Sequence, residues 1–456
     1  MTQTAGQYLA ENREQHLAQL VDFLRIPSIS SLSEHKPHIR QAAEWLSNAL
    51  TQSGLENASI LETGGNPVVY ADYLHAPGKP TVLIYGHYDV QPVDPLPLWV
   101  TGPFEPSVRD GSIYARGASD DKGQTFMHVK ALEALIHSGE LAVNVKLCIE
   151  GEEEIGSVHL VEFVQEHART LAADALVISD SSIFSPDQPA ICYGLRGLCA
   201  LQVDLKTASG DLHSGTYGGA VPNAIHALVE LLATLHDRDG AVSVAGFYDD
   251  VKPLTAEERA AFAALPHDDE TYRTALAMTA LHGEPGYSTL ERATARPTLE
   301  LNGIYGGFQG EGTKTVIPAE AHAKITCRLV EHQTPERIFD LLERHLRQNC
   351  PRGAALSLTR VDKGKPFLTS FDSPAIQIAA AAYEAGWGVK PLFTRMGGSI
   401  PIVEPLSRIL QAPVVLMGFG LDDDNLHAPN ERFALSNYDR GLTTLTYLYT
   451  HLGDMR

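Results

Sequence analysis

The hydrophobic pattern along the chain changes twice, and the first segment, residues 1–190, has the pattern of an α/β fold. Short apolar runs that are typical of buried strands alternate there with stretches in which apolar residues recur every three or four positions. This alternation predicts a mostly parallel central sheet with helices on its faces. The predicted strands cover residues 68–73, 81–86, 112–115, 143–150 and 174–179, and the predicted helices cover residues 6–25, 37–54, 124–137 and 157–168.

The second segment, residues 191–365, has a different pattern. Residues 198–206 and 321–330 alternate strictly between apolar and polar positions, as antiparallel strands with one exposed face do. Helical spacing accompanies them at residues 222–236 and 335–347. These elements predict an inserted α+β domain.

The third segment, residues 366–456, returns to the α/β pattern. We expect helices at residues 373–385, 400–410 and 436–449 and a strand at residues 413–418. The first and third segments are therefore expected to form one domain, which the second segment interrupts. The pattern assigns no role to the acidic, irregular residues 240–298 within the insertion.

Composition and charge limit the classes of molecule that this protein is expected to bind. The 456 residues are 44% hydrophobic and 20% charged, which is typical of a globular protein with a large core. The formal net charge of -21 argues against nucleic acid and anionic membranes, because both require a basic surface. We expect no signal peptide and no membrane span, and the five cysteines have no framework spacing. A cytoplasmic location is the resulting expectation.

Acidic residues and histidines follow several of the predicted strands directly. In α/β sheets, ligand sites lie at the carboxyl ends of the strands, so these side chains are expected to converge. Two histidines and three carboxylates suit a pair of divalent transition ions, most simply zinc, because a bridging hydroxide then makes the centre nearly neutral. The candidate ligands are His87, Asp120, one of the pair Glu153 and Glu154, Asp180 and His427.

Two further acidic residues could assist these ligands, one by orienting a histidine and one as a general base. Asp89 faces the same side of an extended chain as His87, and a carboxylate commonly orients a metal-bound imidazole. Adjacent glutamates cannot easily bind one ion together, so one can ligate while the other acts as a general base toward water. A solvated acidic helix start remains the alternative interpretation of GEEEIGS.

Eight motifs, in the same order along nearly the whole chain, resemble the M20 metallopeptidases, and the carnosine and Cys-Gly dipeptidase branch most of all. They read GHYDVQP, RGASDDKG, EGEEEIGS, VISD, DLHSG, KTVIP, GGSIP and DNLHAPNE. The resemblance implies a zinc-peptidase-like catalytic domain, residues 1–190 and 366–456, interrupted by a lid domain that dimerises, residues 191–365. It also implies a cis peptide between Asp120 and Asp121.

The resemblance implies a role for each candidate at the metal centre. His87 and Asp180 would hold one ion, Glu154 and His427 the other, Asp120 would bridge both, Glu153 would be the general base and Asp89 the partner of His87. On the substrate side, His213 would reach the active site of a partner subunit and stabilise the oxyanion, and Arg328 would bind the substrate carboxylate. Further candidates for substrate contact are Asn302, Thr315, Arg395 and Ser399.

The predicted function is a dinuclear metal-dependent hydrolase. A metal-bridging water and the Glu153 base would cleave the amide bond of dipeptides, or of short peptides with a free C-terminal carboxylate. Zinc is the simplest metal, and manganese or cobalt would suit the same ligands. Met396 stands where an acidic residue is common in the dipeptidase branch, so an N-acyl or N-carbamoyl amino acid amidohydrolase is the alternative. A non-catalytic, metal-loaded peptide-binding protein is the third hypothesis.

Overall fold

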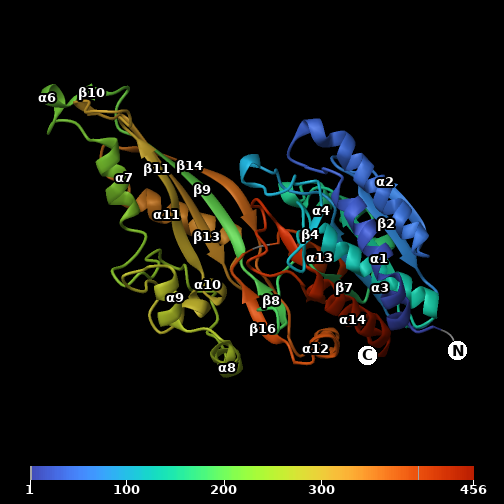
Figure 1. Ribbon diagram of the computed structural model, residues 1–456. Helices are drawn as coiled ribbons and strands as arrows, with labels where there is room; N and C mark the ends of the chain where they lie inside the picture. Colours follow the sequence, from blue (N-terminus) through green and yellow to red (C-terminus); the bar gives the residue numbers. More distant parts are fainter. Residues whose placement is uncertain (1–2, 399, 456) are drawn as a thin grey trace. The chain divides into compact units, whose positions relative to one another are not determined.

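The computed structural model describes residues 3–398 and 400–455, and the chain divides into two compact units (Figure 1). Unit 1 comprises Met1–Tyr193, Thr369–Thr394 and Pro401–Arg456. Unit 2 comprises Gly194–Leu368 and Arg395–Ile400. The short segment Arg395–Ile400 therefore belongs with unit 2, although residues on both sides of it belong to unit 1.

Among the described residues, nine strands form the central sheet, in the order β1-β2-β6-β3-β7-β17-β8-β15 with β16 also paired to β8. The strands β6, β3, β7 and β17 are mutually parallel, whereas β1, β2, β8 and β15 pair in antiparallel fashion. The predicted α/β class is confirmed, with a parallel centre inside a mixed sheet. The bounds are β1 Glu56–Leu61, β2 Val68–Tyr73, β3 Thr81–His87, β6 Asn144–Glu150, β7 Ala175–Ile178, β8 Ala190–Leu195, β15 Phe367–Leu368, β16 Leu392–Met396 and β17 Val414–Leu416.

Helices pack in two groups in unit 1 (Figure 1). One group contains α1 Ala5–Leu24, α2 Lys36–Gln52, α3 Lys122–Ser138, α12 Pro374–Trp387 and α14 Leu435–His451. The other contains α4 Leu160–Glu166, α5 Ala168–Leu171 and α13 Val403–Leu410. Successive residues of β3, such as Leu83 and Ile84, are both fully buried, so the sheet is covered on both faces. The helix predicted at residues 157–168 is broken into α4 and α5.

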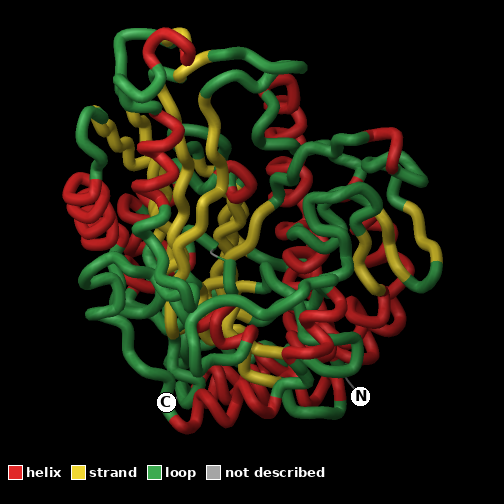
Figure 2. The backbone as a smooth tube through the Cα atoms, turned by 90° about the vertical axis from the view of Figure 1, so that its left-hand side faces the viewer, coloured by secondary structure: helices red, strands yellow, loops and turns green. Residues whose placement is uncertain are grey.

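A four-stranded antiparallel sheet in the order β11-β13-β9-β14 is the core of unit 2. Burial alternates residue by residue along β9 Gly197–Lys206 and β13 Glu320–Leu329, as their sequences predict. The buried face carries α7 Ala224–Leu232 and α11 Pro335–Asn349. The edge strands are β11 Thr298–Gly306 and β14 Ala355–Gly364, and Figure 2 shows the long strands of this sheet side by side.

The remaining elements are short. Unit 2 has the strand pair β10 Leu212–His213 and β12 Val316–Ile317, and α6 Ser214–Tyr217 directly follows β10. Residues 240–298 contain α8 Ala256–Ala264, α9 Asp269–Ala275 and α10 Thr289–Ala295, each with a side-chain N-cap. Unit 1 has a small sheet of β4 Ser107–Arg109, β5 Ser112–Tyr114 and β18 Arg432–Ala434. Within the described part of the chain, no helix has the length and apolar character needed to cross a bilayer.

Candidate metal centre

Strand β3 carries His87 to the carboxyl edge of the central sheet, where His87 pairs in register with Glu150 of β6. The residue before it must be glycine. A Cβ atom on Gly86 would lie 2.1 Å from Thr125 Oγ1 and 2.8 Å from Asp121 Oδ2. The start of α3 therefore rests directly against the strand end, and this close approach brings Asp120 beside His87.

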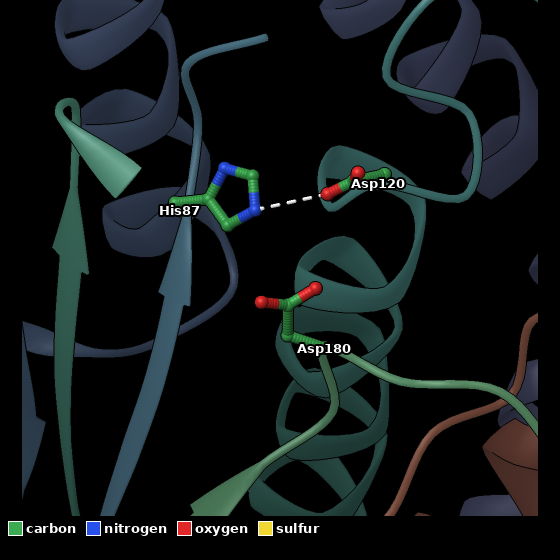
Figure 3. Close-up of side chains that lie close together, drawn as sticks. All are labelled: His87, Asp120 and Asp180. Atoms are coloured by element: carbon green, nitrogen blue, oxygen red, sulfur yellow. Dashed lines mark hydrogen bonds and ion pairs between the residues drawn. The ribbon is translucent and has the colours of Figure 1, made fainter. Parts of the chain in front are cut away.

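Asp120 lies between two groups of potential ligands. His87, Asp120 and Asp180 form the first group, and their ligand atoms lie within 4.8 Å of one another (Figure 3). Asp120, Glu154 and His427 form the second group within the same limit. Asp120 Oδ1 is 3.1 Å from His87 Nε2, and Asp120 Oδ2 is 2.9 Å from His427 Nε2. Each carboxylate oxygen of Asp120 therefore faces a different group, as a bridging ligand requires.

The carboxyl groups in this centre repel one another. Burial, followed by the negative charges of Asp180 and Asp120, raises the pKa of Glu153 to about 8. Burial and the charge of Asp120 raise the pKa of Glu154 to about 10 and the pKa of Asp180 to about 6. Burial would also raise the pKa of Asp120, but its contacts with the two histidines hold that pKa below the ordinary value. A divalent cation would relieve this repulsion.

The three consecutive glutamates have different surroundings. Glu152 accepts hydrogen bonds from the backbone N–H of Asn66 at 2.9 Å and of His159 at 3.2 Å, and its Oε2 is 2.9 Å from His159 Nδ1. Glu154 Oε2 lies 3.3 Å from His427 Nε2. The negative charges of Asp180 and Asp120 raise the pKa of Glu153, but the carboxyl group of Glu153 belongs to neither ligand group. The turn η3 Glu153–Ile155 therefore presents one glutamate as a candidate ligand and one beside it.

Asp89 connects the strand end to this turn. Its Oδ1 lies 3.4 Å from His87 Nδ1, and its backbone oxygen is closer, at 3.1 Å. The two carboxylate oxygens accept hydrogen bonds from the backbone N–H groups of Glu153 at 3.2 Å and Glu154 at 3.1 Å. Asp89 therefore orients the imidazole and also fixes the backbone that carries both glutamates.

An Asp89→Asn variant tests this double contact. Asparagine keeps one acceptor oxygen but replaces the other with an NH₂ group, which cannot accept the second N–H. We expect the affinity for Zn²⁺ to fall by about 10- to 100-fold, as for other partners of metal ligands. Competitive titration with a metal chelator measures it, with Asp187→Asn at an exposed position as the control. Equal zinc affinity in both variants would contradict the role of Asp89.

The turn that carries Asp120 is held by Glu431, which sequence analysis missed. Glu431 is fully buried and accepts hydrogen bonds from the backbone N–H groups of Gly117 and Ser119, both at 2.9 Å, and of Asp120 at 3.1 Å. Its Oε2 also accepts from Arg116 Nη1 at 2.7 Å. The peptide between Asp120 and Asp121 in this turn is cis, as the resemblance implied. No spacing in the sequence indicates this contact, because Glu431 and Asp120 are 311 residues apart.

Removing Arg116 should destabilise unit 1. Arg116→Met leaves the buried Glu431 carboxylate without its cation, which typically costs about 3–5 kcal/mol. We expect a clear fall in the thermal unfolding temperature, measured by calorimetry. The control is Arg347→Met, because Arg347 pairs with Glu343 on an exposed helix surface, where an ion pair contributes about 0.3–0.5 kcal/mol. Similar unfolding temperatures for the two variants would rule out the role assigned to Arg116.

The loop that carries His427 adopts unusual backbone conformations. Asn425, His427 and Asn430 have φ values of 57°, 58° and 63°, in the left-handed region that non-glycine residues rarely adopt. The buried Asp424 carboxylate accepts hydrogen bonds from Leu421 N–H at 2.8 Å and Ser119 Oγ at 3.1 Å. Local strain of this kind is typical of functional sites, and here it positions a candidate ligand.

The described candidates for substrate contact belong to unit 2, whereas the ligand groups belong to unit 1. His213 Nδ1 accepts hydrogen bonds from the N–H groups of Gly215 at 3.0 Å and Thr216 at 3.3 Å, so the ring hydrogen is on Nε2. Thr315 offers its carbonyl to Ser214 N–H.

The other unit 2 candidates have distinct surroundings. Arg328 lies in β13, and its charge contributes, after burial, to lowering the pKa of Arg196 to about 10. Arg395 pairs with Glu258 of α8, and Asn302 lies at the bulge of β11. Ser399 lies outside the described residues.

Comparison with known proteins identifies relatives that all point to one peptidase family. The model of peptidase family M20/M25/M40 matches residues 83–451. The Cys-Gly metallodipeptidase DUG1 of Candida albicans is 33% identical over 96% of this chain and 94% of its own length. The human Beta-Ala-His dipeptidase is 34% identical over 85% of this chain and 78% of its own length. The solved structure of the M20 family metallo-carboxypeptidase Sso-CP2 from Sulfolobus solfataricus has a TM-score of 0.85, with 33% identity, and covers 96% of this chain and 99% of that one.

Proposed function

The chain belongs to peptidase family M20/M25/M40, and we propose that it is a dinuclear metal-dependent dipeptidase. It would cleave the amide bond of dipeptides, or of short peptides with a free C-terminal carboxylate. The observation that carries the proposal is the position of Asp120, whose two carboxylate oxygens face two separate ligand groups. Relatives named as Cys-Gly and Beta-Ala-His dipeptidases support the substrate class.

The donor set fits a pair of zinc ions, and Mn²⁺ or Co²⁺ would suit it as well. His87 and Asp180 would hold one ion, Glu154 and His427 the other, and Asp120 both. The buried Glu154 Oε1 has no hydrogen-bond partner among the described residues, and an ion at this carboxylate would satisfy it. When bound, the ions polarise the scissile carbonyl and lower the pKa of the attacking water.

Glu153 is the general base in this proposal. Its carboxyl group accepts a proton from the attacking water and delivers that proton to the departing amine. Glu152 is excluded as the general base because both of its carboxylate oxygens are already engaged. One accepts a hydrogen bond from the backbone N–H of Asn66, and the other contacts His159 Nδ1. The base therefore acts beside the ligand groups, on the same turn as the proposed ligand Glu154.

Residues of unit 2 would bind the substrate. His213 carries a hydrogen on Nε2, so it can donate to the oxyanion of the tetrahedral intermediate in a partner subunit of a homodimer. The Arg328 guanidinium would bind the C-terminal carboxylate in bidentate fashion. Asn302, Thr315, Ser399 and Arg395 remain candidates for further contacts. Unit 2 is thus proposed as the lid and dimerisation domain.

We also propose a cytoplasmic location, because the five cysteines, all within the described residues, form no disulfide.

A hydrolysis screen tests the proposal. The protein is stripped with a chelator, reloaded with Zn²⁺ or Mn²⁺, and incubated with a dipeptide library and the N-acetylated form of each dipeptide. Metal-dependent cleavage of the free dipeptides supports the proposal. Cleavage of only the N-acetylated compounds would favour the amidohydrolase alternative, which Met396 keeps open. Metal binding without any cleavage would favour a peptide-binding protein.

A further inference from the structure

A buried histidine that is neither a proposed ligand nor the proposed general base lies in α3. His128 is 1% exposed, and every residue of α3 from Lys122 to Leu132 is buried. The helix begins two residues after Asp120, so it connects this histidine to the proposed bridging ligand. A polar ring enclosed in this way must be hydrogen-bonded, because an unpaired buried polar group is costly.

Both ring nitrogens of His128 have a partner. Nδ1 lies 2.6 Å from the hydroxyl oxygen of Tyr449 in α14, and Nε2 lies 2.7 Å from Ser179 Oγ. Burial lowers the pKa of His128 to about 3, so the ring is neutral and donates one of these bonds while it accepts the other. Tyr449 and Ser179 are buried as well. The imidazole therefore links α3 to the C-terminal helix on one side and to Ser179 on the other.

Ser179 lies at the point where β7 leaves the central sheet. The register of β7 with β3 and with β17 ends at Ile178, so Ser179 and the candidate ligand Asp180 lie beyond the last paired residue of the strand. These two registers therefore do not fix Asp180. The hydrogen bond between the His128 ring and the Ser179 hydroxyl holds the residue directly before it.

The same helix is also bonded to the strand that carries His87. Asp121 Oδ2 accepts hydrogen bonds from the backbone N–H of His87 at 3.2 Å and from Thr125 Oγ1 at 2.7 Å. Helix α3 therefore contacts the ends of both strands that supply the first ligand group, and Asp120 lies at its own start. The separation of the three candidate ligands depends on these contacts.

We propose that His128 is a positioning residue that holds Asp180 at the separation from Asp120 that the first ion requires. The inference rests on the proposed function, because it concerns a support of the proposed dinuclear centre. Through Ser179, the ring joins the chain that carries Asp180 to the helix that begins beside Asp120. Groups that orient metal ligands commonly change metal affinity by about 10- to 100-fold, and we expect about tenfold for this contact, which acts through the neighbouring residue.

The second ligand group has supports of its own. The backbone N–H of Glu154 donates to Asp89 Oδ2 at 3.1 Å, and Glu154 Oε2 accepts from Gln91 Nε2 at 2.8 Å. None of these contacts involves α3 or Ser179. Loss of the bond between His128 and Ser179 should therefore weaken the binding of one ion and spare the other.

Stepwise titration of the metal-free protein with Zn²⁺ against a chelator tests the inference, because it follows the two ions without a measurement of activity. The Asp180→Ala variant identifies the step that belongs to the first group. Ser179→Ala and His128→Asn should each weaken that step by about tenfold and leave the other step unchanged. Asparagine is too short to reach Ser179, whereas glutamine can place its amide near the position of Nε2, so His128→Gln should restore the affinity.

Tyr449→Phe is the matched control. It removes one hydroxyl from the opposite nitrogen of the same buried ring, so it should lower the thermal unfolding temperature as Ser179→Ala does but keep both zinc affinities. The double variant His128→Asn/Ser179→Ala should bind zinc like either single variant, because both substitutions remove the same bond.

The outcomes separate this inference from the proposed function. If Ser179→Ala and His128→Asn bind both ions as the wild type does, His128 is not a positioning residue and the dinuclear function stands. An equal loss in Tyr449→Phe would also overturn the inference, because the effect would then come from general packing of the core. Ser179→Ala leaves the ring in place, so the test does not depend on a folded His128→Asn protein. A wild-type protein that binds fewer than two ions per chain would contradict the proposed function itself, and the inference with it.

Discussion

The Glu153→Gln variant is expected to lose roughly 10²- to 10⁴-fold in kcat, the range that a general base contributes. Glutamine has nearly the same shape as glutamate but cannot take up the proton of the attacking water. Glu153 belongs to neither ligand group, so the variant should retain its metal. Steady-state kinetics and elemental analysis of the same sample measure both quantities.

The neighbouring glutamate provides a matched control for this substitution. Glu152→Gln makes the identical chemical change one residue away, at a carboxylate that Asn66 and His159 hold outside the ligand groups. We expect that variant to keep kcat within a few-fold of the wild type. If the two variants lost kcat equally, or if Glu152→Gln lost more, the base would not be Glu153.

Replacing Asp120 should remove both ions at once. The Asp120→Ala variant lacks the one carboxylate that the two ligand groups share, so we expect neither stoichiometric zinc nor measurable hydrolysis. Asp180→Ala should behave differently, because Asp180 belongs to the first group alone and the second group stays complete. Elemental analysis after dialysis against limiting Zn²⁺ distinguishes the two variants. A full metal complement in Asp120→Ala would show that Asp120 is not a shared ligand.

The buried elements of the fold could be predicted from the sequence, and the exposed ones could not. The strand at residues 81–86 is a continuous apolar run, and β3 is buried along nearly its whole length. By contrast, β11 and β14 are edge strands, and most of their positions are exposed or half-buried. Such strands need no apolar alternation, so their sequences carry little signal. The pattern at residues 157–168 indicated one helix because it does not reveal the break between α4 and α5.

At the candidate centre, the ligand types could be predicted because acids and histidines follow the buried strands. His87 and Asp180 lie just where strand ends meet in a parallel sheet. The supporting contacts were not predictable, because they join side chains to backbone groups far away in the sequence. Glu431 holds the N–H of Asp120, which is 311 residues away, and this contact follows no sequence spacing. The second contact of Asp89, with the glutamate turn, was missed for the same reason.

An anomalous-difference map from crystals of the zinc-loaded wild-type protein would locate the ions directly. We expect a pair of zinc peaks about 3.5–4 Å apart, one beside His87 and Asp180 and one beside Glu154 and His427, with Asp120 contacting both. A single peak, or peaks that do not contact Asp120, would contradict the proposed dinuclear centre.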